Sequence, residues 1–336
     1  MSFDPDAAAQ PGSGIFGLDC ERKDSRVILL PVPFDATTSY RRGTSLGPAA
    51  IFRASAQVDL YDRRMGRIYE RGIHMIDEVD RLWKLSEETA EHAASLIEAG
   101  GARPEDAGTV RKIDVACEEV NAYVYAEVRK ILRENKIPGV IGGEHSVPFG
   151  AIRACAEHHE KIGLLHIDAH MDFRDAFEGM TWSHASIMHN VMSRVPGITK
   201  IVQVGIRDFG ERELEFATRL GDRCVVHFDD AWGERLLNAE PFSTLIAQAI
   251  DPLPEKVYVS FDIDALEPSL CPNTGTPVPG GLSFTQASLL LDALRTSGRT
   301  VVGFDLVEVA PSHDDDAPEL DGNVGARILY KLCGLA

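Results

Sequence analysis

Several absences in the sequence exclude whole classes of protein. No apolar run reaches the ~20 residues that a membrane span needs. There is no surplus of positive charge either, since 52 acidic residues outnumber 34 basic ones and the formal net charge is −18. Nucleic acids and anionic membranes are bound through basic faces. We therefore expect neither a nucleic acid nor a membrane as a partner, and the acidity mildly favours a cationic ligand.

Cysteine is also sparse and shows no pattern. The six cysteines occur without a CxxC pair or any other paired spacing, so we expect no cysteine-based metal site and a reduced, cytoplasmic protein. The amino-terminal stretch MSFDPDAAAQPGSG lacks the basic start and apolar core of a secretory signal. We interpret residues 1–24 as a mobile amino-terminal arm and residues 25–336 as one domain without internal repeats.

The chain does contain a regular alternation of apolar, β-branched runs with amphipathic segments. A long amphipathic helix is predicted from about residue 109 to 136. Beyond it, apolar strand segments and helical segments follow one another to the carboxyl terminus. This order predicts an α/β fold in which a mostly parallel sheet is covered by helices on both faces. Ligands of such sheets bind at the carboxyl ends of the strands.

Potential metal ligands stand at the ends of three of these apolar runs. The apolar run 139–143 precedes one potential ligand, the run 161–167 precedes three, and the run 256–261 precedes two. The six residues are His145, Asp168, His170, Asp172, Asp262 and Asp264. Alternate residues of an extended segment point the same way, so we expect each group to converge.

These six residues carry too much negative charge to be buried alone. A single Asp-x-Asp is usually a turn or a helix cap, but here three groups end three hydrophobic strands. Four carboxylates cannot be buried without compensating positive charge, and two divalent ions would supply it in full. We therefore predict a dinuclear metal site.

The motifs GGEHS, DAHMD and SFDIDALEP, with EVAP near the carboxyl terminus, resemble those of the ureohydrolase family, which includes arginase, agmatinase, guanidinobutyrase and formimidoylglutamase. The resemblance extends from about residue 27 to 333. The loops PFDATTSYRRGTSLGP and NTGTPVPGGLS are most similar to those of the agmatinase branch. The resemblance implies a ureohydrolase catalytic domain over residues 25–336, built as a single three-layer α/β/α domain around a mostly parallel eight-stranded sheet.

The resemblance also implies which residues hold each ion. One ion would be bound by His145, Asp168, Asp172 and Asp262, and the other by Asp168, His170, Asp262 and Asp264. Asp168 and Asp262 would bridge the two. Mn²⁺ is the expected metal, since it suits carboxylates with some imidazole, and Ni²⁺ is the alternative. The family further implies a homo-oligomer, either a trimer or a hexamer.

Three residues have implied roles in catalysis, the hydrolysis of a guanidino C–N bond to urea and an amine. Two neighbouring cations lower the pKa of water toward about 7, and Asp172 would orient the resulting hydroxide. His184 would transfer a proton or hydrogen-bond the substrate, although it could also be only a helix-entry residue. Glu308 would clamp the guanidinium, although it could be an ordinary strand-end carboxylate. We interpret His166 as a core or supporting residue, not a ligand.

The substrate tail is less well specified by the sequence. Phe173 and Arg174 replace the small polar pair of arginases, which speaks against arginine, so agmatine is the first expectation. Arg174 could instead anchor a carboxylate tail, as in guanidinobutyrate or guanidinopropionate, or simply pair with Asp175 or Glu178. Guanidine and biguanides are further alternatives.

A non-catalytic, metal-bound partner subunit would have lost a ligand, and this chain has lost none. A deacetylase-like enzyme with one zinc ion would need fewer carboxylates.

Overall fold

An eight-stranded parallel sheet forms the centre of the computed structural model, which describes residues 4–312 and 319–336. All the pairings in this sheet are parallel, so the predicted fold class is confirmed. The strands in spatial order are β4 (Ile73–Met75), β1 (Val27–Val32), β5 (Ile137–Gly142), β10 (Thr300–Val307), β9 (Lys256–Asp262), β6 (Ile162–Ile167), β7 (Ile198–Ile206) and β8 (Cys224–Phe228). A separate antiparallel pair joins β2 (Tyr61–Asp62) to β3 (Gly66–Arg67).

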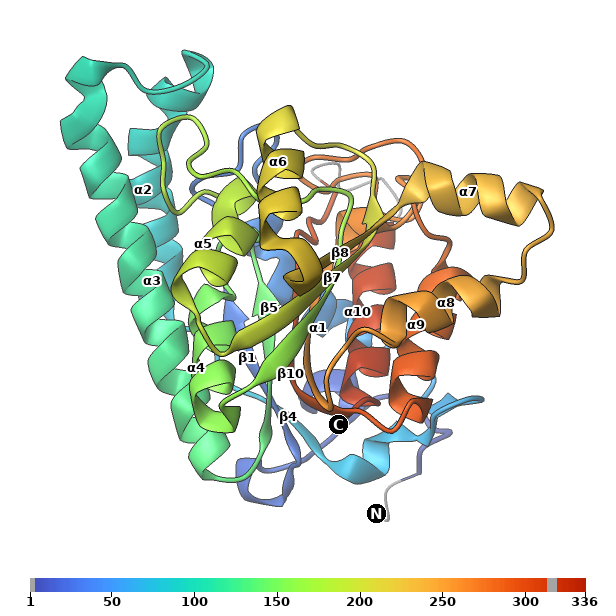
Figure 1. The fold of residues 1–336 in the computed structure, drawn as a ribbon. Coiled ribbons are helices and arrows are strands. Elements are labelled where there is room, and N and C mark those ends of the chain that lie inside the picture. Colours follow the sequence, from blue (N-terminus) through green and yellow to red (C-terminus); the bar gives the residue numbers. More distant parts are fainter. Residues whose placement is uncertain (1–3, 313–318) are drawn as a thin grey trace.

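Helices cover both faces of the sheet and complete three layers (Figure 1). One face carries α2 (Asp80–Glu98), α3 (Ala107–Arg133), α4 (Phe149–His159) and α5 (Ile187–Arg194). The other carries α1 (Gly47–Ser55), α8 (Phe242–Ile250), α9 (Phe284–Thr296) and α10 (Leu320–Cys333). Two more helices, α6 (Glu211–Leu220) and α7 (Asp229–Leu237), flank β8. Among the described residues, no helix is both long and apolar enough to cross a membrane.

Each face of the sheet packs against its own hydrophobic core, which explains why the strands are unbroken apolar runs in the sequence. Every residue of β6 is buried. Two consecutive residues of this strand, Leu164 and Leu165, pack into different cores. Leu164 lies in the core beneath α4, and Leu165 lies in the core beneath α9. They separate because successive side chains of a strand point to opposite faces of the sheet. A strand buried on both faces needs apolar residues at every position. Polar residues in such a strand are therefore exceptional, and several of them support the site described below.

One predicted boundary differs from the observed one. The long helix α3 ends at Arg133 and not at residue 136, because Asn135 adopts a left-handed conformation with φ of 57°, a common way to end a helix. Part of the segment expected to be a mobile arm packs onto the domain. Phe16 is buried, its ring lies 4.8 Å from that of Tyr330, and its N–H donates to Ser55 Oγ at 2.9 Å. Residues 1–3 lie outside the described residues, and the boundary at residue 24 stays a prediction.

The sheet order brings the predicted site together. The four adjacent strands β5, β10, β9 and β6 lie near the middle of the sheet. His145, Glu308, Asp262 and Asp168 lie at or just beyond the carboxyl ends of these strands. Since all the strands run in parallel, the four residues meet at one edge of the sheet.

A close approach of α3 and α4 also supports this edge. A Cβ atom at Gly150 in α4 would lie 2.2 Å from the carbonyl oxygen of Asn121 in α3. Both partners are main chain, so neither can move without shifting a helix. The absence of a side chain at residue 150 thus sets the distance between the two helices.

We predict that Gly150→Ala lowers the free energy of unfolding by about 1–3 kcal/mol, the usual cost of overpacking a core. Gly233→Ala is the matched control, since a Cβ at Gly233 in helix α7 meets nothing within 4 Å. Alanine is the better helix former, so this variant should gain up to ~1 kcal/mol. Thermal and denaturant unfolding of both variants would measure the difference. Equal stabilities would contradict the assigned close packing of α3 on α4.

Candidate metal centre

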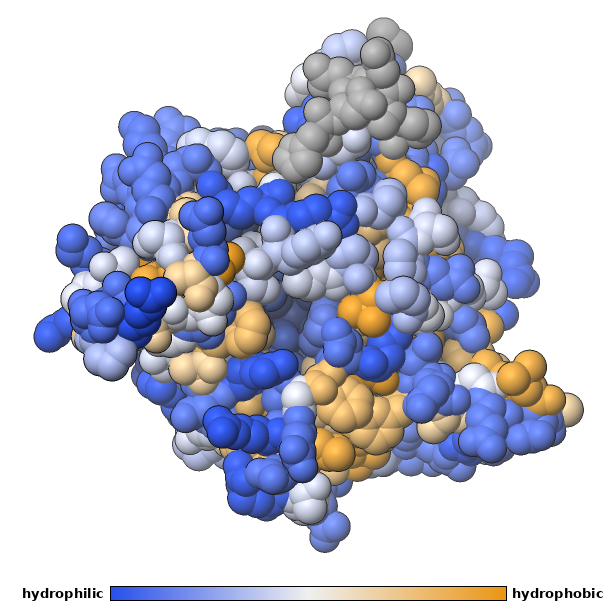
Figure 2. Space-filling view, turned by 90° about the horizontal axis from the view of Figure 1, so that it is seen from above, coloured by the Kyte–Doolittle hydropathy of each residue, from blue (hydrophilic) through white to orange (hydrophobic). Residues whose placement is uncertain are grey.

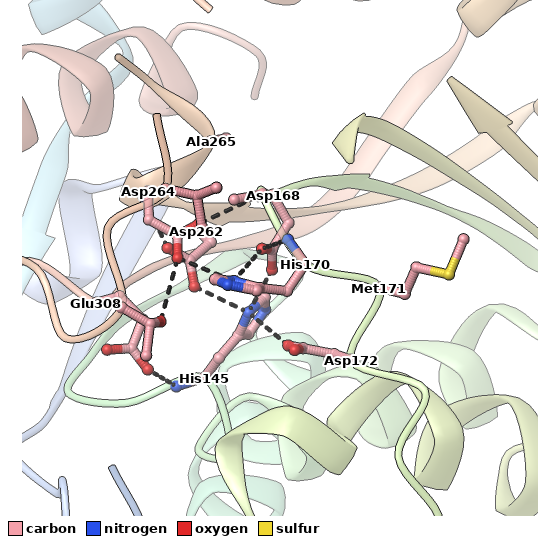
Figure 3. Close-up of polar contacts among 12 residues, drawn as sticks. His145, Asp168, His170, Met171, Asp172, Asp262, Asp264, Ala265 and Glu308 are labelled. Carbon is pink, nitrogen blue, oxygen red and sulfur yellow. Dashed lines mark hydrogen bonds and ion pairs between the residues drawn. The ribbon is translucent and has the colours of Figure 1, made fainter. Parts of the chain in front are cut away.

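His145 stands at the centre of three carboxylates. Its Nδ1 atom lies 2.9 Å from Asp168 Oδ2, and 3.1 Å from both Asp172 Oδ2 and Asp262 Oδ2. The side chain of His145 is almost fully buried. Figure 3 shows the imidazoles and carboxylates turned toward one another while Met171, between two candidate ligands, points away.

A buried relay fixes the orientation of the His145 ring. The Ser260 hydroxyl donates to Asp305 Oδ1 at 2.9 Å, and Ser260 Oγ lies 2.9 Å from His145 Nε2. Since Ser260 gives its only proton to Asp305, it accepts one from His145 Nε2–H. The Nδ1 lone pair of His145 then faces the three carboxylates, an arrangement that is repulsive without a proton or a cation. These donor atoms fit a divalent metal ion.

Asp168 also belongs to a second group. His170 Nδ1 lies 3.1 Å from Asp264 Oδ2 and 3.5 Å from Asp168 Oδ1. These three residues could hold a metal ion together. Asp168 therefore turns one oxygen toward each group. Asp262 turns Oδ2 toward His145, while its Oδ1 accepts the N–H of Asp264 at 2.8 Å.

The convergence of these residues depends on turns and not on extended backbone. Residues 263–265 form a single 3₁₀ turn, and Asp172 has a left-handed backbone with φ of 55°. The sequence pattern predicted this convergence on the premise that each segment is extended, with alternate side chains on one side. That premise was wrong for both segments. The side chains still gather because Asp262 and Asp168 each accept a backbone N–H from the residue two positions later, which closes a tight turn.

Burial and mutual repulsion shift the titration of this cluster. Burial, followed by the charges of Asp264 and Asp168, raises the pKa of Asp262 well above its usual range. Burial alone would lower the pKa of His145, but its hydrogen bonds to Asp168, Asp172 and Asp262 outweigh this effect and raise it well above the usual range. Without metal, the cluster therefore retains protons as its compensating charge. A bound cation would take their place.

His166 supports Asp168 from beneath. The Gln203 side-chain amide donates to Met171 O at 2.8 Å and lies 2.9 Å from His166 Nδ1. His166 Nδ1 thus accepts, so Nε2 carries the proton and donates to Asp168 Oδ2 at 2.8 Å. The sequence did not single out Gln203, Ser260 or Asp305. The feature of the sequence that could have identified them is that each is a polar residue inside an otherwise apolar strand.

His184 and Glu308 lie next to each other beside the cluster. His184 Nδ1 is 3.9 Å from Glu308 Oε1, and burial, reinforced by the nearby His170 and His145, lowers the pKa of His184 to about 3. Glu308 Oε1 accepts the backbone N–H of His145 at 2.8 Å. Its Oε2 is buried and has no hydrogen-bond partner among the described residues. Burial and the charge of Glu144 raise the pKa of Glu308 well above its usual range.

A cavity of about 310 Å³ opens onto His170, Asp172 and His184. Arg174 and Asp208 also line the wall of this cavity. Figure 2 looks onto this end of the molecule and shows a hollow bordered largely by hydrophilic residues. A small polar ligand could reach the cluster through such an opening.

Arg174 has a different partner from the two that the sequence suggested. Its Nε lies 2.9 Å from Glu213 Oε2, and its guanidinium stacks 5.2 Å above the Phe177 ring centre. Glu213 also accepts the backbone N–H of Phe173 at 3.0 Å. The alternative of a pairing with Asp175 or Glu178 is therefore not the one observed, because the first turn of α6 places Glu213 against the loop.

We predict that Asp168→Ala loses most of its bound metal, because Asp168 contributes to both groups. Metal content per chain, measured by mass spectrometry after loading with Mn²⁺, tests this directly. Mn²⁺ at about 100 times its Kd should add about 2.7 kcal/mol per bound ion to the stability of the wild type and much less to the variant. Asp208→Asn, which lies outside the cluster, should retain its metal. An Asp168→Ala protein that kept two ions per chain would refute the shared role.

Comparison with known proteins agrees with the motifs. The model of the arginase family matches residues 25–334. The chain is 32% identical to the N(1)-aminopropylagmatine ureohydrolase of Thermus thermophilus, over 96% of this chain and 94% of that protein. It is 30% identical to the agmatinase of Pyrococcus horikoshii, over 94% and 93%.

The fold is also shared with solved structures. The proclavaminate amidino hydrolase from Streptomyces clavuligerus superposes with a TM-score of 0.76, at 24% identity and over 98% of both chains. This likeness supports the fold alone, whereas the family model and the sequence relatives cover nearly the entire chain. The chain therefore belongs to the arginase family, as its motifs predicted, and is an amidinohydrolase.

Proposed function

We propose that this protein hydrolyses a guanidino C–N bond and releases urea, with agmatine as its substrate and putrescine as the second product. The observation that carries the proposal is the combination of a buried His–Asp cluster with an unpaired Glu308 oxygen beside it. The cluster suits divalent cations, and the carboxylate suits a guanidinium. No other described part of the chain joins these two features.

The six predicted ligands would hold two divalent cations. His145, Asp168, Asp172 and Asp262 surround one position, and Asp168, His170 and Asp264 the other, with Asp262 proposed as the second bridge. Bound Mn²⁺, or Ni²⁺ as the alternative, would lower the pKa of water toward about 7 and so supply the nucleophile at neutral pH. Asp172 would orient that nucleophile with the carboxylate oxygen that does not face His145.

Glu308 would bind the guanidinium. Its Oε2 atom is buried and has no hydrogen-bond partner among residues 4–312 and 319–336, and a Cβ atom at Gly275 would lie only 3.1 Å from it. Glycine at this position therefore keeps a side chain from crowding this oxygen. A hydrogen bond to a charged group contributes about 1.5–3 kcal/mol, and the guanidinium N–H groups would supply the missing donors.

His184 would handle the proton of the leaving amine. The backbone N–H of Ser39 points at His184 Nε2 at 3.4 Å, so a neutral ring carries its proton on Nδ1. This proton faces the Glu308 side of the site, 3.9 Å from Oε1. The amine that leaves the guanidino carbon needs a proton, and the attacking water is its source. The neutral His184 ring would pass this proton on by taking one up at one ring nitrogen as it gives one up at the other.

The tail of the substrate would lie along the cavity wall. Arg174 is already paired with Glu213, whereas the Asp208 carboxylate has no ion pair or hydrogen bond among the described residues. The uncompensated charge on this wall is therefore negative, which favours the ammonium tail of agmatine. The similarity to an agmatinase and an aminopropylagmatine ureohydrolase supports the same choice.

A guanidino acid is the second candidate. The Arg174 side chain is 42% exposed and lines the cavity, so a carboxylate tail could compete with Glu213 for it. Guanidinobutyrate or guanidinopropionate would then be preferred. A homo-oligomeric state and a cytoplasmic location stay predictions of the sequence.

We predict the highest kcat/KM for agmatine when urea release is measured with Mn²⁺ and, in parallel, with Ni²⁺. The panel includes arginine, 3-guanidinopropionate, 4-guanidinobutyrate, guanidine and a biguanide. Arg174→Ala should change the agmatine constants little, and a large loss confined to the acidic substrates would identify Arg174 as their anchor. No urea from any compound, with two metals bound, would overturn the proposed reaction.

We predict that His184→Ala keeps its metal but lowers kcat by about 10²–10⁴-fold, the range that general acid–base catalysis contributes. Steady-state kinetics with the preferred substrate and metal analysis of the same sample would test both parts. His159→Ala at the end of α4 is the control and should retain full turnover. Unchanged kcat in His184→Ala would remove this residue from the mechanism.

A further inference from the structure

Glu144 is a buried carboxylate next to the metal cluster to which the mechanism above gives no role. It is fully buried and accepts hydrogen bonds from the Thr37 N–H and the Thr37 hydroxyl, both at 2.7 Å, and from Ser146 Oγ at 2.5 Å. Two of these bonds reach a segment more than 100 residues away in sequence. Its side chain thus joins the end of β5 to the loop that follows β1.

The end of β5 is a rigid anchor for this carboxylate. The Glu144 N–H donates to Phe34 O at 2.8 Å, and the Gly143 N–H donates to Val32 O at 2.9 Å. A Cβ atom at Gly143 would lie 2.0 Å from Phe34 O, so the two backbones are in direct contact. Residues 35–39 leave this anchored edge and run toward the site.

Thr37 connects Glu144 to His184. The Thr37 hydroxyl has one proton and donates it to Glu144 Oε1. Its oxygen is then free to accept the backbone N–H of His184 at 3.1 Å. Two residues later, Ser39 Oγ lies 3.1 Å from His184 Nε2. The same loop therefore holds both the backbone and the ring of His184.

We propose that Glu144 is a positioning residue that acts through Thr37 to hold His184 against Glu308. Glu144 orients the Thr37 hydroxyl, the hydroxyl holds the backbone of His184, and Ser39 holds the ring. This inference rests on the proposed function, because His184 has a role in turnover only there. A displacement of about 1 Å can cost 10²-fold in rate, so a side chain that touches no reacting atom can still control kcat.

The test compares the two hydroxyls that donate to Glu144 Oε1, of which only that of Thr37 also accepts the backbone N–H of His184. Thr37→Val removes the link to His184 at nearly constant volume, and we expect kcat to fall by about 10- to 100-fold with metal content unchanged and KM nearly so. Thr37→Ser restores the hydroxyl and should recover most of kcat. Ser146→Ala removes the other hydroxyl that donates to Glu144 Oε1 but leaves the Thr37 link to His184 in place, so it should keep kcat within about twofold of the wild type.

A double-mutant cycle separates positioning from general structural support. In the His184→Ala background, Thr37→Val should cause no further loss of kcat, because residues that act as a unit are not additive. A full additional loss would overturn the inference. So would equal effects of Thr37→Val and Ser146→Ala, or a loss of metal in Thr37→Val, which would place the action of Glu144 on His145 instead.

A measurement without substrate keeps this inference separable from the proposed reaction. In metal-free protein with ¹⁵N-labelled histidine, the wild-type His184 should show the two well-separated ring nitrogen signals of one fixed tautomer. Thr37→Val should average them, while Ser146→Ala should not. Unaltered signals in Thr37→Val would overturn the positioning role. An absence of urea release by the wild type would overturn the reaction and leave this result standing.

Discussion

The burial of four carboxylates at one edge of a parallel sheet is the constraint on which the rest of this structure depends. Like charges in a medium of low polarity repel strongly, so each oxygen needs a donor that holds it in place. Backbone N–H groups serve this purpose: His170 N–H binds Asp168 Oδ1 at 2.6 Å, and Ala169 N–H binds Asp264 Oδ1 at 3.1 Å. These bonds fix the carboxylates before any cation binds, which reduces the reorganisation that metal binding requires.

The same constraint explains the polar residues inside apolar strands. Ser260 and Asp305 on neighbouring strands orient His145, and Gln203 on β7 orients His166. This support leaves some groups incompletely satisfied, since Asp305 Oδ2 and Gln203 Oε1 are buried and have no hydrogen-bond partner in the described part of the chain. Unsatisfied buried groups are costly. Their concentration beneath the metal cluster indicates that the sheet gives up stability at this edge to hold the ligands in one orientation.

The sequence predicted the fold class and the meeting of the ligands because both follow from local pattern. Apolar runs mark strands buried on both faces, and ligands after parallel strands must share one edge. It could not predict contacts that depend on how distant segments pack. Arg174 binds Glu213, 39 residues later, only because α6 begins beside its loop, and Phe16 reaches Tyr330 across nearly the whole chain. Gln203 stands out in the sequence as a polar residue within an apolar strand, but the sequence does not show its partner, because His166 lies on another strand.

Backbone strain at the site shows why local pattern alone also misjudged how the ligands converge. Asp172 and Glu308 have left-handed backbones, with φ of 55° and 62°, a conformation that costs roughly 1–2 kcal/mol for residues with a side chain. Each is held by specific bonds: His189 N–H binds the Asp172 carbonyl at 3.0 Å, and Thr274 Oγ1 binds the Glu308 carbonyl at 2.8 Å. An extended backbone would carry each side chain away from the cluster, so the strain is what returns these two carboxylates to it.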